Sequence, residues 1–144
     1  MKILAIGDIV GVRAIEHLKQ NLWSLRRKLG IDFVVANGEN ATEIHGLGAS
    51  DAQKILDSGV DLITMGNHTW SKRDLYNFLD DNPDKIIRPA NYPGNAPGCS
   101  YTTVDVCGYK LLCMNAQGVA FMEPLADPFL CVEKILEQNK GKYD

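Results

Sequence analysis

The stretch Phe33-Val34-Val35-Ala36-Asn37-Gly38-Glu39-Asn40 joins a short apolar run to a cluster of polar residues. The same pattern occurs in Ile3-Leu4-Ala5-Ile6-Gly7-Asp8 and in Leu62-Ile63-Thr64-Met65-Gly66-Asn67-His68. Continuous apolar runs of this length are typical of parallel strands that are buried on both faces. Each polar cluster is therefore predicted to lie at the carboxyl end of a strand.

These polar clusters are predicted to form one site. In open α/β sheets, ligands bind outside the carboxyl ends of the strands, so the three clusters should meet although they are far apart in sequence. Two carboxylates, two amides and one imidazole would come together there: Asp8, Glu39, Asn40, Asn67 and His68. Oxygen and nitrogen donors of this kind favour a divalent metal ion and a phosphate-bearing substrate.

Helical patterns separate the predicted strands. Apolar residues at spacings of three and four predict a helix over Ile15–Leu29, ended by Gly30. Ser50 and Gln53 resemble a capping box that would start a second helix, and Ser71 is expected to cap a third. This alternation of strand and helix is typical of an α/β fold with a mostly parallel sheet.

The last third of the sequence has a different pattern. Tyr101–Val106 and Tyr109–Met114 flank Cys107-Gly108 and predict an antiparallel hairpin. Asp127-Pro128 predicts the start of a final helix, with the aspartate as N-cap and the proline in the first turn. The sequence has no internal repeat and no low-complexity linker, so we expect residues 1–144 to form a single domain.

Composition excludes several classes of protein. The net charge of −3 argues against a general surface for duplex nucleic acid, which requires a basic stripe. No apolar stretch is as long as a membrane span, and the N-terminus lacks the pattern of a signal peptide. The four cysteines form no Cys-X-X-Cys pair, which indicates free thiols in a reducing compartment. We therefore expect a cytoplasmic protein without a membrane partner.

Each candidate residue also has a structural interpretation. Taken alone, Asp8 is compatible with a helix cap, Glu39 with a solvated carboxylate in an Asn-Gly turn, and His68 with a structural histidine. Their occurrence at equivalent strand ends favours a functional site instead. Three other polar residues are weaker candidates for contacts with a substrate: His45, Asn91 and Gln117.

The three clusters together resemble the motifs of the calcineurin-like metallophosphoesterases. Three longer stretches, Asn37–Ala41, Thr64–Trp70 and Arg88–Pro93, look like one branch of that superfamily. This branch is the YmdB-like bacterial phosphodiesterases, which are linked to 2′,3′-cyclic nucleotides. The resemblance extends through Asp127-Pro128-Phe129 and implies a metallophosphoesterase-type α/β sandwich acting on a small phosphate ester.

The resemblance also implies a role for each residue of the site. Asp8, Glu39 and Asn40 would bind one divalent metal ion, and Glu39 would bridge to a second ion held by Asn67. His68 would protonate the leaving oxygen or stabilise the phosphoryl group. The metals of the family are usually iron or manganese, with magnesium as an alternative. Two such ions polarise a phosphate and lower the pKa of a bridging water.

Two departures from the family pattern affect these expectations. Arg13-Ala14-Ile15 stands where the family commonly has a Pro-Gly-Arg-like segment. Family members are nearly twice as long, and their later half supplies three more histidine ligands, whereas this sequence has only His17, His45 and His68. We therefore expect a truncated metallophosphoesterase domain over residues 1–144, with an incomplete second metal site and little turnover by the isolated chain.

Two alternatives remain open at this stage. The first is a non-catalytic binding module whose uncovered apolar surface self-associates or pairs with a partner chain that completes the site. The second is a flavodoxin-like nucleotide binder that uses the same crevice without metals. The second has little support, because no Gly-X-Gly-X-X-Gly motif follows the first strand and acidic strand ends repel bare phosphate.

Overall fold

A computed structural model describes residues 1–43 and 45–144 of the chain. One sheet contains four parallel strands in the order β1 (Ile3–Ile6), β2 (Phe33–Asn37), β3 (Leu62–Thr64) and β4 (Ile86–Ile87). A separate antiparallel hairpin consists of β5 (Tyr101–Val106) and β6 (Tyr109–Met114). The described helices are α1 (Gly11–Leu29), α2 (Ala49–Asp57), α3 (Leu75–Asp81) and α4 (Pro128–Gln138). The predicted α/β fold, with its parallel sheet and later hairpin, is confirmed.

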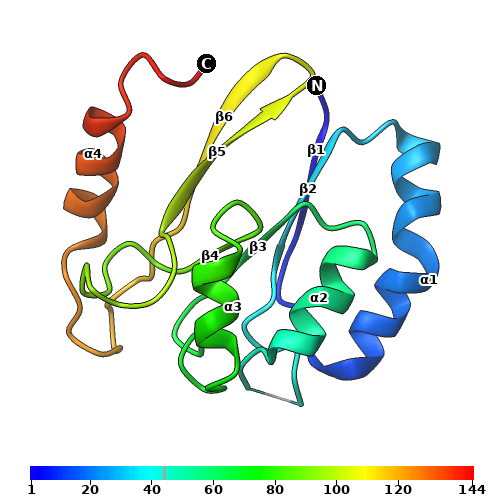
Figure 1. Cartoon of the computed structure of the whole chain (residues 1–144), viewed down its shortest axis with the longest axis horizontal. Coiled ribbons are helices and arrows are strands. Elements are labelled where there is room, and N and C mark those ends of the chain that lie inside the picture. Colours follow the sequence, from blue (N-terminus) through cyan, green and yellow to red (C-terminus); the bar gives the residue numbers. More distant parts are fainter. Residues whose placement is uncertain (44) are drawn as a thin grey trace.

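The elements form layers around the parallel sheet (Figure 1). α1, α2 and α3 cover one face, where Ala36 and Ile63 of the sheet are buried against helix residues such as Leu22. The hairpin packs on the opposite face, where Phe33 and Leu62 belong to a second apolar cluster with its residues. α4 lies on the other side of the hairpin from α1 (Figure 1).

The register of the sheet explains why its strands are apolar on both faces. Ala36 lies beside Ile63, and both side chains point toward the helices. Val35 lies beside Leu62, and both point toward the hairpin. Because successive side chains of a strand alternate between faces, a strand covered on both sides requires an uninterrupted apolar run.

Several predicted element ends are confirmed. Gly30 ends α1 with a left-handed backbone (φ 62°), and its N–H donates to the carbonyl of Arg26. Asp127 caps α4, because its carboxylate accepts hydrogen bonds from the backbone N–H groups of Phe129 and Leu130. Cys107 and Gly108 both have positive φ (55° and 84°), as the tight turn of a two-residue hairpin requires.

The predicted starts of α2 and α3 are wrong. The N-cap residue of α2 is Gly48 and the helix begins at Ala49. Ser50 therefore lies inside the helix and does not cap it. α3 begins after Asp74 and not at Ser71, because turns occupy the intervening residues. The backbone N–H groups of Gly48 and Ala49 instead bind side chains outside the helix: the hydroxyl of Thr42 and the carboxylate of Asp74, respectively.

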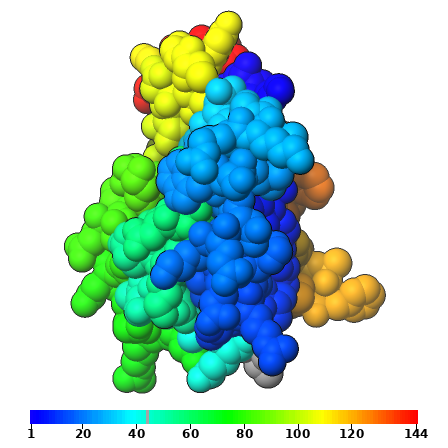
Figure 2. Space-filling view, turned by 90° about the vertical axis from the view of Figure 1, so that its right-hand side faces the viewer, coloured from blue at the N-terminus to red at the C-terminus, as the bar shows by residue number. Residues whose placement is uncertain are grey.

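The exposed surface of α1 occupies much of the view in Figure 2. Charged and polar residues such as Arg13, Glu16 and Lys19 lie on this exposed side, and His17 is exposed beside them. Across residues 1–43 and 45–144, α1 included, no helix combines the length and the apolarity that crossing a bilayer would require.

Replacement of Ile63 by alanine tests the core of the sheet. Ile63 lies in β3 with no exposed surface, so Ile63→Ala should reduce the free energy of unfolding by about 2–5 kcal/mol. Ile3→Ala is the matched control, because Ile3 is 50% exposed and its loss should cost only about 0.5 kcal/mol. Urea denaturation of the two variants measures the difference, and equal losses would contradict this account of the core.

Candidate metal centre

Asp8 and Asn40 meet at the carboxyl ends of β1 and β2. The side-chain amide of Asn40 donates from Nδ2 to both carboxylate oxygens of Asp8, at 3.0 and 2.9 Å. The backbone holds the two loops together, since Ile9 N donates to the carbonyl of Asn37 and Gly11 N to that of Asn40. Parallel pairing of the strands therefore brings a carboxylate and an amide into contact from two separate loops.

Glu39 lies between the ends of β2 and β3. Its Oε2 accepts a hydrogen bond of 2.9 Å from the backbone N–H of His68. Nearby, the Nδ2 of Asn67 lies 3.3 Å from the Nε2 of His68. Glu39, Asn67 and His68 are thus neighbours, as the sequence clusters predict, and the peptide bond of His68 orients the carboxylate of Glu39.

Gly66 leaves the space that Glu39 occupies. A Cβ at position 66 would collide with the carboxylate group of Glu39, so no larger residue fits without moving that side chain. The glycine is needed here for close approach and not for an unusual backbone angle. The sequence contained a signal for this contact, because Gly66 directly precedes Asn67-His68 at a strand end.

The two histidines near the site lie against each other. The ring centroids of His45 and His68 are 4.5 Å apart, and the ring planes are inclined by 34°. His45 is exposed, whereas His68 is half-buried. The structure thus places His45 beside the strand-end cluster, although it comes from the loop between β2 and α2.

Asn91 and Gln117 form a buried pair. The amide of Asn91 donates to the backbone carbonyl of Gln117 and accepts from its backbone N–H, at 2.8 and 3.0 Å. The hydroxyl of Tyr92 donates to Oε1 of Gln117 at 3.1 Å. Burial, followed by the negative charges of Glu123 and Glu39, raises the pKa of Tyr92. Asn91 thereby positions the loop that carries Gln117.

An open cavity of about 390 Å³ lies beside the cluster. Three of its lining residues were predicted as site residues from the sequence: Glu39 and Asn67 as metal ligands, and Gln117 as a weaker candidate for substrate contact. Asn37 and Asn115 also line it, and sequence reasoning did not select Asn37 as a site residue. Asn37 is the last residue of β2, so the direction of its side chain depends on the register of the strand. Its Oδ1 accepts from the backbone N–H of Glu39.

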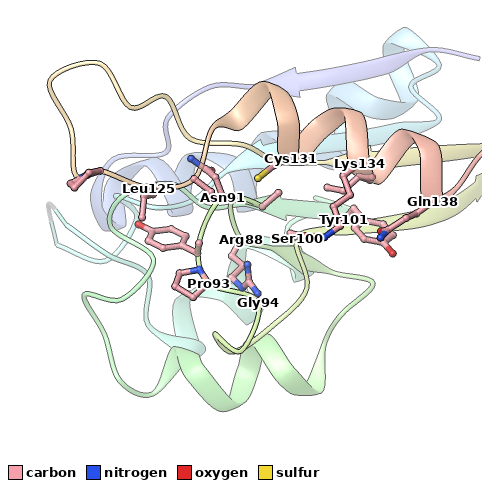
Figure 3. A pocket seen from close by; sticks show the side chains of 15 residues that line it. Arg88, Asn91, Pro93, Gly94, Ser100, Tyr101, Leu125, Cys131, Lys134 and Gln138 are labelled. Carbon is pink, nitrogen blue, oxygen red and sulfur yellow. The ribbon is translucent and has the colours of Figure 1, made fainter.

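A larger cavity, of about 590 Å³, lies elsewhere, between the segment after β4 and α4 (Figure 3). Lys134 and Gln138 of α4 line one side, and Arg88 lines the other. Arg88 donates to the backbone carbonyls of Pro89, Ala96 and Pro97, so its guanidinium group shapes the surrounding loop. Of the predicted site residues, this cavity contains Asn91 alone, and it is therefore distinct from the strand-end cluster.

The carboxylate and amide side chains at the strand ends are of the kind that bind a divalent cation. In the described part of the chain, no group of three or more His, Cys, Asp or Glu side chains is arranged to hold a metal. The candidate set instead combines two carboxylates with two amides. Asn40 Oδ1 is buried and has no hydrogen-bond partner, while its Nδ2 donates to both carboxylate oxygens of Asp8. A cation beside Asp8 would bind the carboxylate, and a turn of about 180° of the Asn40 side-chain amide would bring Oδ1 to the same ion.

Comparison with known proteins identifies the family of this chain. The sequence profile described as "YmdB-like protein" matches residues 4–144. The chain belongs to the YmdB-like family. A 2′,3′-cyclic-nucleotide 2′-phosphodiesterase of Bacillus subtilis is 41% identical over 138 residues, which are 96% of this chain and 52% of that protein. The chain thus spans about half the length of this curated relative.

Solved structures agree with this membership. A hypothetical protein of Thermus thermophilus has a TM-score of 0.90 at 35% identity, covering 97% of this chain and 54% of that one. A phosphatase of Mycoplasma pneumoniae has a TM-score of 0.87 at 25% identity, covering 97% and 52%. A 5′-nucleotidase precursor of T. thermophilus, at 14% identity and a TM-score of 0.63, shares the fold. The predicted resemblance and the metallophosphoesterase fold class are confirmed.

A small change at Gly66 tests the geometry of the cluster. Gly66→Ala places a methyl group against the carboxylate of Glu39, and this overpacking should cost about 1–3 kcal/mol of stability. Gly7→Ala is the control: Gly7 directly precedes Asp8, but a Cβ there meets no atom within 4 Å. Chemical denaturation compares the two variants. A Gly66→Ala protein as stable as Gly7→Ala would contradict the observed contact.

Proposed function

We propose that this chain supplies the carboxylate half of a phosphoesterase active site that hydrolyses small phosphate esters through divalent metal ions. The observation that carries this proposal is the convergence of Asp8, Asn40 and Glu39 at neighbouring strand ends, with Asn67 beside them. The name of the B. subtilis relative, at 41% identity, supports 2′,3′-cyclic nucleotides as the substrate class.

Two overlapping groups of residues would hold the metals. Asp8, Glu39 and Asn40 form the first group, and Glu39 with Asn67 forms the second. When bound, the divalent ions would polarise the phosphate and lower the pKa of a water ligand. We propose iron or manganese, as the family resemblance implies, with magnesium as an alternative that carboxylate and amide oxygens also suit.

The other residues of the cluster would orient the reacting groups. The backbone N–H of His68 fixes the carboxylate of Glu39, so that the two strand ends keep a constant spacing. The ring of His68 contacts the side-chain amide of Asn67 and the ring of His45, and these two contacts would restrict its rotation. His68 would donate a proton to the leaving oxygen of the ester, in the manner of a general acid.

Turnover by the isolated chain should be low. The cluster offers two carboxylates and two amides, and the sequence contains only three histidines, of which His17 lies on the exposed side of α1. The further histidine ligands that the family resemblance implies are not among them. Metal affinity should therefore be weaker than in the longer relatives, because fewer ligands surround each ion.

Hydrolysis of 2′,3′-cyclic AMP in the presence of Mn²⁺ tests this function. We expect slow, metal-dependent hydrolysis that falls about tenfold or more in His68→Ala, since a general acid typically contributes at least that much. His17→Ala is the matched control and should retain the activity of the unmodified chain. Metal-independent hydrolysis, or equal rates in His68→Ala and His17→Ala, would contradict the proposed site. Turnover equal to that of the B. subtilis relative, assayed alongside, would contradict the expected weakness.

A further inference from the structure

The cavity between α4 and the segment after β4 is large enough to hold a small molecule (Figure 3). It is here termed the α4 cavity, and residues such as Arg88, Tyr101 and Lys134 line it. Its volume is about 590 Å³. Pockets that bind small ligands commonly measure about 300–1,000 Å³. None of the proposed metal ligands lines the α4 cavity, so a molecule bound there would be separate from the strand-end cluster.

One face of α4 forms a wall of this cavity. Cys131, Lys134, Ile135 and Gln138 line it, and spacings of three and four place these residues on the same face of a helix. Ile135 is buried, whereas Lys134 and Gln138 are exposed. The helix therefore presents an ammonium group and a side-chain amide beside apolar atoms.

The charged residues of the α4 cavity are both cationic. Among the described residues that line it, only Lys134 and Arg88 carry a charge. Across residues 1–43 and 45–144, neither side chain forms an ion pair with a carboxylate. The chain as a whole has a net charge of −3, so this concentration of unbalanced positive charge is a local feature. Such a cavity attracts anions.

Arg88 is a buried cation. Its side chain is only 5% exposed, and its guanidinium group donates to three backbone carbonyls. These bonds use three of the five N–H groups of an arginine. Burial lowers the pKa of Arg88, and electrostatic contributions from Cys99 and Asp80 act in the opposite direction. Because a buried charge without a counter-ion is costly, an anion in the adjoining cavity would stabilise this arginine.

The other lining residues supply hydroxyl groups and an apolar wall. Ser100 and Tyr101 carry hydroxyls that can donate to an anion. Figure 3 shows Tyr101 at the same end of the cavity as Lys134. Pro93 and Leu125 contribute apolar surface. Flat apolar groups pack well against an aromatic ring such as that of Tyr101. The lining therefore suits a molecule that combines an anionic group with a flat apolar body.

We propose that the α4 cavity binds a phosphate monoester with a flat apolar body, such as a nucleoside monophosphate. The ammonium group of Lys134 and the hydroxyls of Ser100 and Tyr101 bind the phosphate, and the charge of Arg88 stabilises it from the buried side. A phosphate monoester carries a charge of about −1.5 to −2 at pH 7, which two cations balance, whereas a monocarboxylate would balance only one. The inference does not depend on the metal centre or on hydrolysis.

Calorimetric titration with AMP in the presence of EDTA tests this site. The chelator removes divalent ions from the strand-end cluster, so that only metal-independent binding is measured. We expect saturable binding of AMP. Adenosine, which lacks the phosphate, should bind about tenfold more weakly or worse. Inorganic phosphate, which lacks the apolar body, should also bind more weakly than AMP. Absence of saturable AMP binding would overturn the proposal, and so would equal affinity for AMP and either of the other two compounds.

Replacement of Lys134 by alanine tests the phosphate contact. Lys134→Ala should weaken AMP binding by about tenfold or more, because a charge-assisted hydrogen bond is lost. Lys19→Ala is the matched control, since it removes the same charge from an exposed position of α1. Alanine is favourable in helices, so both variants should fold. Equal affinities for AMP in Lys134→Ala and Lys19→Ala would overturn the proposal.

Nuclear magnetic resonance locates the bound molecule. With AMP and EDTA, the backbone amide signals of Ser100, Tyr101 and Lys134 should shift, whereas those of Asn67 and His68 should stay in place. Shifts confined to Asn67 and His68 would place AMP at the strand ends and would overturn the proposal. This measurement needs neither metal nor turnover, so its result and that of the hydrolysis assay are independent.

Discussion

The parallel pairing of β1, β2 and β3 is the constraint on which the rest of this structure depends. The register sets Ile6 beside Ala36 and Asn37 beside Thr64. The loops that follow these residues therefore leave the sheet at the same edge, and their polar side chains meet. A shift of one residue in either pairing would move every side chain of the strand to the opposite face of the sheet. It would also separate the carboxylate and amide side chains at the strand ends. Burial on both faces of the sheet keeps this register in place.

The strand-end cluster concentrates negative charge that the protein itself only partly balances. The side-chain amide of Asn40 donates hydrogen bonds to Asp8, and the peptide N–H of His68 donates one to the carboxylate of Glu39. These hydrogen bonds orient the carboxylates, but they leave Asn40 Oδ1 buried without a partner. In the proposed function, a divalent cation would balance this charge.

Local sequence patterns predicted most of the strands and several helix ends, because the interactions that form them join residues close together in the sequence. Apolar runs located the buried strands, Gly30 and Asp127 marked helix ends, and glycine beside carboxylate or amide marked the strand-end loops. The starts of α2 and α3 were not predictable in this way. The N–H groups at the start of α2 are satisfied by Thr42 and Asp74, and no sequence spacing within the helix reveals such partners. The approach of His45 to His68 and the pairing of Asn91 with Gln117 likewise depend on how distant loops pack.

The most direct test of this account is a titration of the metal-free chain with Mn²⁺ by isothermal calorimetry. The account predicts saturable binding that becomes about tenfold weaker or more in Asp8→Asn, which removes one charge at nearly constant size. Asp84→Asn, which changes a carboxylate that is 65% exposed and outside the cluster, should bind as the unmodified chain does. Absence of saturable binding, or equal affinity in Asp8→Asn and Asp84→Asn, would contradict the claim that these strand ends form a metal site.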